Sequence, residues 1–118
     1  MPKIARDART RLYDILEATT RNRGRIAEVS DAEFVTGSTV FDAVAMNIVV
    51  IGQSVVHLPP ELKAGEAEVP WRQIVASRNL VAHGYPELDP NVIWMIATTQ
   101  LEDLDATTKR MIATLEGN

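Results

Sequence analysis

Residues 38–58 read STVFDAVAMNIVVIGQSVVHL and are followed by Pro59 and Pro60. This segment predicts one long helix that begins at Ser38 or Thr39 and runs to about Leu58, because proline ends a helix and disfavours helical backbone in the residue before it. Its apolar residues cover more than one face of such a helix, which indicates a burial partner beyond the core, most simply another copy of the chain. The β-branched run 48–51 would also suit a strand, but no other segment offers that strand a partner.

The N-terminal part of the chain predicts one long helix and one short helical turn. Apolar residues recur three or four positions apart from Ile4 to Leu16, as in an amphipathic helix, and Asn22 to Gly24 should end or fray it. Ser30-Asp31-Ala32-Glu33 has the spacing of a capping box, in which the serine and the glutamate each satisfy a free backbone donor of the other residue. A short helical turn through Phe34 should follow.

After a polar connector over residues 59–70, the chain predicts two further helices. Pro70 suits the first turn of a helix from Trp71 to about Ala82, which Gly84 and Pro86 would end. Asp89-Pro90 suits the start of a last helix, with the aspartate as its cap. The core stripe of that helix would be Ile93, Ala97, Leu101, Leu104, Met111 or Ile112, and Leu115. We therefore expect an all-α fold with four main helices and one short helical turn in a single domain, 1–118.

Composition excludes several classes of site. The 118 residues contain no cysteine, so disulfides, thiolate metal sites and cysteine nucleophiles are ruled out. No basic start precedes an uninterrupted apolar run, and the most apolar window, Val40 to Leu58, is broken by polar residues. We expect neither a membrane span nor a signal peptide, and a cytoplasmic protein.

The net charge of -4 hides an uneven distribution. Residues 1–25 hold seven of the 12 lysines and arginines but only three of the 16 acidic residues. Such a split could steer a polyanion to one face, or the basic helix could simply pair with acidic neighbours, which is the interpretation we favour. The overall acidity argues against a broad surface for nucleic acid.

Ser77-Arg78-Asn79-Leu80-Val81-Ala82-His83-Gly84-Tyr85 is the segment with the most chemistry. Arginine offers a permanently charged fork of donors that suits phosphate, and histidine can exchange a proton near neutral pH. On a continuous helix Arg78 and His83 would point about 140° apart. They could face one cavity if Arg78 lies in the final turns of the helix and His83 sits where the chain leaves it at Gly84, or they could converge from two subunits. Alternatively, Arg78 pairs with a carboxylate and His83 caps the last carbonyls of the helix.

Arg78, four intervening residues and His83-Gly84-Tyr85 resemble the RxxxxHxY motif of the HEPN superfamily, in particular its small HepT-type toxins. The resemblance covers nearly the whole chain. It includes 12–16, Phe34, 42–44, Asn47, Ile51-Gly52, Leu58-Pro59, 70–74 and the helix of Trp94. Two positions depart from the pattern: Gln53, where an acidic residue would be expected, and Pro86, where an aromatic residue would be more usual.

The resemblance implies an antiparallel helical bundle that dimerises and acts as a metal-independent ribonuclease on RNA, without a cofactor. Arg78 would bind the scissile phosphate, His83 would move a proton, and Asn79 would orient the pair by hydrogen bonding. In HepT-type systems the motif tyrosine, here Tyr85, is the target of nucleotide transfer by a partner nucleotidyltransferase antitoxin. Against this stands a second hypothesis, a catalytically inactive helical module that binds a nucleotide or a protein.

Overall fold

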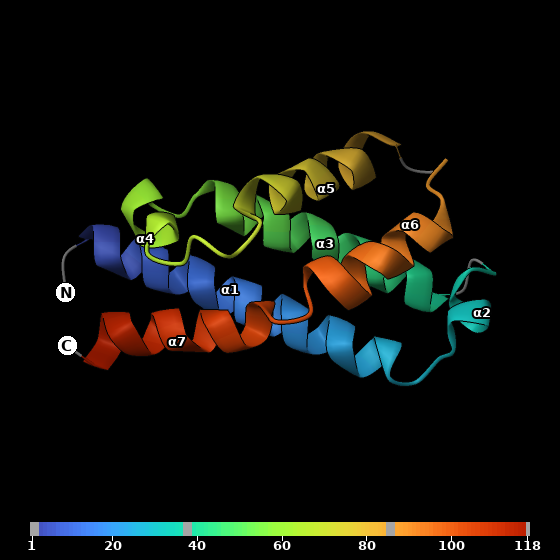
Figure 1. Cartoon of the computed structure of the whole chain (residues 1–118), viewed down its shortest axis with the longest axis horizontal. Helices are drawn as coiled ribbons and strands as arrows, with labels where there is room; N and C mark the ends of the chain where they lie inside the picture. The colour runs from blue at the N-terminus through green and yellow to red at the C-terminus, as the bar shows by residue number, and fades with distance from the viewer. Residues whose placement is uncertain (1–2, 37–38, 85–86, 118) are drawn as a thin grey trace.

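The computed structural model describes residues 3–36, 39–84 and 87–117, and every regular element in these ranges is helical (Figure 1). The elements are α1 (Lys3–Ile26), α2 (Asp31–Phe34), α3 (Thr39–Val56), α4 (Pro60–Ala64), α5 (Trp71–Gly84), α6 (Pro90–Met95), the π-helical turn η1 (Ile96–Gln100) and α7 (Leu104–Gly117). The predicted all-α class is confirmed. Ser38, one of the two predicted starts of the long helix, lies outside the described residues, and α3 begins at the other, Thr39.

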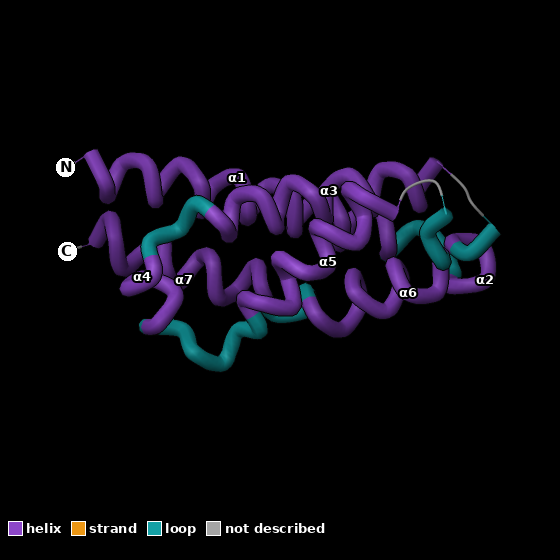
Figure 2. The backbone as a smooth tube through the Cα atoms, turned by 90° about the horizontal axis from the view of Figure 1, so that it is seen from above, coloured by secondary structure: helices purple, strands orange, loops and turns teal. Residues whose placement is uncertain are grey.

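Helix α3 is the central element of the bundle. It packs along α1 on one side and along α5 on the other, and α7 lies along α1 (Figures 1 and 2). The fully buried residues of α3 and α1 form the middle of the core, together with Phe34 of α2, Ile74 of α5 and Ile93 of α6. By length and composition, α3 is the one helix of the described ranges that could cross a membrane, but half of it is buried within the bundle.

Helix α1 continues through the segment at which we expected it to end. Asn22 is 3% exposed, and its side chain accepts a hydrogen bond from Asn47 Nδ2 at 2.9 Å and donates to the carbonyl of Val44 at 3.4 Å. These contacts with α3 satisfy the side-chain amide of Asn22, which would otherwise compete for backbone hydrogen bonds and favour a helix end. The helix therefore runs on past the exposed Gly24 to Ile26.

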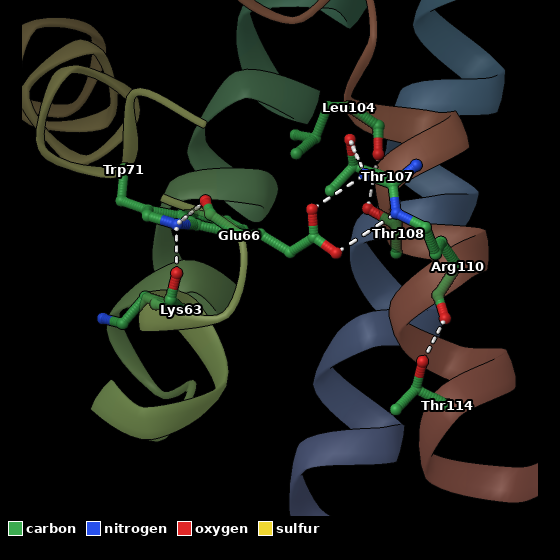
Figure 3. Close-up of polar contacts among 8 residues, drawn as sticks. All are labelled: Lys63, Glu66, Trp71, Leu104, Thr107, Thr108, Arg110 and Thr114. Carbon is green, nitrogen blue, oxygen red and sulfur yellow. Dashed lines mark hydrogen bonds and ion pairs between the residues drawn. The ribbon is translucent and has the colours of Figure 1, made fainter. Parts of the chain in front are cut away.

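The connector at 59–70 contains a helix that the sequence did not predict. Pro60 stands in the first turn of α4, which ends at Ala64. Trp71 Nε1 donates to the carbonyl oxygens of Lys63 at 3.0 Å and Glu66 at 3.1 Å, and the Glu66 carboxylate accepts two hydrogen bonds from Arg110 of α7 (Figure 3). The connector is thus fastened to both α5 and α7.

The last predicted helix is broken into two. Asp89 caps its start as expected, accepting from the backbone N–H of Asn91 at 2.9 Å. The π-helical turn η1 and the turn at 101–103 then separate α6 from α7. This break keeps Ile96 and Leu101 buried and redirects α7 along α1, so the apolar stripe does not follow one straight helix.

Ion pairs account for part of the basic N-terminal segment. Arg9 pairs with Glu116, Arg21 with Glu17 and Arg23 with Asp105. This arrangement supports the pairing interpretation over a surface reserved for a polyanion.

Candidate functional site

The site is built where α3 and α5 come closest together. Gly52 of α3 faces Arg78 of α5, and a Cβ atom added to Gly52 would lie only 2.1 Å from Arg78 Cβ and 3.3 Å from the carbonyl oxygen of Ile74. Only glycine leaves room for the arginine stem at this crossing. The contact brings the guanidinium of Arg78 beside the next residue of α3, Gln53.

Two neutral amides hold the guanidinium of Arg78. Its NH2 group donates to Gln53 Oε1 and its NH1 group to Asn79 Oδ1, each at 2.7 Å. Its Nε is buried without an acceptor among the described residues. None of the ion pairs within the described ranges involves Arg78. Among the described residues, Arg78 therefore does not pair with a carboxylate, as the alternative interpretation required. The positive charge of Arg78 remains available to an anion.

Arg78 and His83 both lie on α5 and are five residues apart. Helix α5 ends at Gly84, the predicted end, so His83 lies in its last turn with helical backbone. The two side chains therefore point about 140° apart. Arg78 is half-buried against α3, whereas His83 is exposed, and no side chain of the described residues donates to or accepts from its ring. The tyrosine of the motif, Tyr85, lies outside the described residues, as does Pro86.

An apolar groove runs between α3 and α5. It has a volume of about 460 Å³ and is lined by Asp42, Ala45, Met46, Val49, Val81 and Ala82. Arg78 and His83 stand on either side of Val81 and Ala82 in the sequence. On the same helix α3, Met46 is 61% exposed and Val50 is 37% exposed. The second apolar face that the sequence predicted for this helix is thus present and uncovered in the single chain.

Sequence reasoning missed the partnership of Gln53 with Arg78. The departure at Gln53 was visible in the sequence, but its contact joins residues 25 positions apart on two helices that cross. The local signal was the adjacent Gly52, because a glycine on a helix permits another helix to approach closely. In the described part of the chain, no cluster of three or more histidine, aspartate or glutamate side chains could hold a metal ion.

The all-helical bundle, with Arg78 seated at the crossing of α3 and α5, is consistent with a HEPN-type fold. Residues 15–111, which include both Arg78 and His83, match the ribonuclease HepT-like family. The chain therefore belongs to this family, and the class of enzyme that the family describes is the ribonucleases.

Relatives with ribonuclease names cover most of the chain. A candidate RNase of Methanocaldococcus jannaschii is 26% identical over 99% of this chain and 95% of its own length. Another from the same organism is 28% identical over 99% of this chain and 95% of its own length. A protein named "Probable ribonuclease HepT" from Thermococcus cleftensis is 26% identical over 79% of this chain and 84% of its own length. No solved structure matches the chain at a significant level.

Proposed function

We propose that this protein, as one HEPN domain over residues 1–118, is a metal-independent endoribonuclease that acts as a homodimer. The observation that carries the proposal is the guanidinium of Arg78, held by two neutral amides with no carboxylate partner among the described residues. Because Arg78 and His83 point apart on one helix, each site combines Arg78 of one subunit with His83 of its partner.

The reaction divides between the two side chains. Arg78 binds the scissile phosphate and stabilises the charge that develops on its oxygens. His83 removes the proton from the 2′-hydroxyl or returns one to the leaving oxygen. Asn79, which accepts from Arg78 NH1, keeps the guanidinium oriented.

The apolar surface of α3 supports the homodimer. Met46, Val50 and Val56 are all more than one third exposed on this helix, and the groove between α3 and α5 is lined by Val81 and Ala82 of the helix that carries Arg78. Covering this surface with a second copy would bury it and bring two α5 helices together. The same contact would place an exposed His83 against the partner's arginine.

The first test is cleavage of transfer and messenger RNA in the presence of a chelator, by the wild-type protein and by His83→Ala. Particle size and helical content are measured alongside. Removing a positioned proton-transfer group typically costs about 10²–10⁴-fold in rate, and we expect the loss without any change in size or fold, because His83 is exposed. Equal cleavage by both proteins would contradict the assignment of His83. No cleavage by unmodified wild-type protein would favour the inactive binding module.

A partner nucleotidyltransferase antitoxin completes the proposal. It would transfer a nucleotide to Tyr85 and place a bulky anion next to the arginine and histidine, which stops cleavage. The motif resemblance at Arg78, His83 and Tyr85 motivates this step, and we further propose that the protein is a toxin that acts on RNA in the cytoplasm. Intact-mass measurement after incubation with ATP and a cognate nucleotidyltransferase tests it, with Tyr85→Phe as the control that must stay unmodified.

A further inference from the structure

We propose that Gln53 is a positioning residue of the site, whose neutral amide holds the guanidinium of Arg78 without neutralising it. The inference rests on the proposed function only in taking a phosphodiester as the ligand of Arg78. It assigns a role to the position at which this chain departs from the acidic residue expected of its family.

Three contacts determine where the guanidinium lies. Gly52 accommodates the stem of Arg78, Gln53 Oε1 accepts from NH2, and Asn79 Oδ1 accepts from NH1. Nε is buried, but NH1 and NH2 each carry a second N–H that these two amides do not use, and these two donors can meet an anion.

The choice of an amide over a carboxylate decides the charge that a phosphate meets. A glutamate at this position would accept the same hydrogen bond from Arg78, but the bond would become an ion pair. The pair would be locally neutral, so it would attract a phosphate much less than a lone guanidinium does. Glutamine retains the geometry of the bond and leaves the full positive charge in place.

The experiment compares Gln53→Glu and Gln53→Leu with wild-type protein. The control is Gln73→Glu, which adds the same charge on the exposed side of α5, five residues before Arg78. The probe is a short single-stranded 2′-deoxyoligonucleotide, which lacks the 2′-hydroxyl needed for cleavage. Its binding is measured by fluorescence anisotropy over a range of salt concentrations, and the thermal midpoint of each variant is measured in parallel.

We expect Gln53→Glu to weaken binding about tenfold or more at low salt, and to make the dependence on salt shallower by about 0.7 in logarithmic slope, the value for one phosphate contact on a single strand. Its thermal midpoint should not fall below that of the wild type, because the ion pair replaces the lost bond. Gln73→Glu should change binding less than about twofold. Weaker binding without a loss of stability distinguishes a role in the site from a structural one.

Gln53→Leu separates position from charge. It keeps the charge of Arg78, so binding of the deoxyoligonucleotide should stay within about threefold of wild type. The loosened guanidinium should lower kcat for RNA about tenfold or more while KM changes little.

Three results would overturn the proposal: Gln53→Glu binding like Gln73→Glu, Gln53→Glu melting below the wild type, or Gln53→Leu cleaving with the wild-type kcat. Absence of binding by the wild type would also overturn it. If the wild type binds the deoxyoligonucleotide but cleaves no RNA, the proposed ribonuclease fails, while the two binding comparisons still decide the role of Gln53.

Discussion

Gly52 and Arg78 illustrate how one missing side chain positions another. The stem of the arginine occupies the space that a Cβ on Gly52 would need, and the guanidinium then reaches Gln53 and Asn79. A substitution at Gly52 therefore acts on the site and on helix packing together. The effect belongs to the contact between α3 and α5 and not to the helix propensity of glycine.

We predict that Gly52→Ala destabilises the protein by about 1–3 kcal/mol, because the added methyl overpacks the crossing of α3 and α5. Displacement of Arg78 should also weaken phosphate binding. Thermal unfolding and deoxyoligonucleotide binding measure the two effects. The matched control is Gly24→Ala in α1, where nothing lies within 4 Å of the added atom and alanine should stabilise the helix by about 0.5–1 kcal/mol. The prediction fails if the two variants melt alike.

At the scale of the elements, polar contacts between helices determine where α1 and the connector lie. Asn22 and Asn47 are both buried and hydrogen-bonded to each other, which joins α1 to α3 inside an apolar core. Glu66 and Arg110 join the connector to α7 near the surface (Figure 3). These two links differ in burial, and they should respond differently to mutation and to pH.

Removing one partner of the buried pair should be costly. We expect Asn47→Leu to lower the free energy of unfolding by about 1–3 kcal/mol, because the oxygen of Asn22 is then left buried without a donor. Asn22→Leu should cost a similar amount, and the double variant should lose less than both single changes together. Denaturant unfolding of the four proteins measures this coupling. Strictly additive losses would show that the hydrogen bond contributes nothing to stability.

The link at the surface should be sensitive to acid. Arg110 donates to the Glu66 carboxylate and holds its pKa below the usual range. A lowered folded-state pKa stabilises the protein above the pKa of the unfolded carboxyl, and this stabilisation is lost as the pH falls through the folded value. Glu66→Gln should therefore melt slightly below wild type at pH 7, and the two should converge below about pH 4. Glu61→Gln, which changes an exposed carboxylate of α4, is the control. A midpoint difference that persists unchanged in acid would contradict the ion-pair account.

At the scale of the whole molecule, Arg78 and His83 point in different directions from α5. A mixing experiment can test whether each site takes one of these residues from each subunit. Arg78→Ala and His83→Ala should each be inactive alone if every site takes one residue from each subunit. Equal mixing with subunit exchange makes about half of the dimers mixed, and each mixed dimer regains one intact site, so about a quarter of wild-type activity should return. RNA cleavage with particle size measures this. Sites confined to single subunits would regain none.

Met46→Glu provides the complementary test of the dimer. Met46 is 61% exposed beside the apolar groove, so the change should leave the folded subunit intact while placing a charge in the proposed interface. We expect smaller particles and loss of cleavage. The control is Ala32→Glu on the exposed side of α2, which should preserve both particle size and activity. Val35→Glu would not serve as a control, because Val35 packs against the core.

The sequence by itself determined the all-α class, the capped starts at Ser30 and Asp89, the central helix with its excess apolar surface, and the motif of Arg78 and His83. These features are local, because caps and helical periodicity depend on residues within about one or two turns of each other. Only the tertiary structure decided that α1 passes Asn22, that the last helix breaks at η1, and that Gln53 holds Arg78. Each of these depends on contacts between segments far apart in the chain. Such contacts can override local preference, since a buried hydrogen bond or a close helix crossing has no counterpart in the pattern of a single helix.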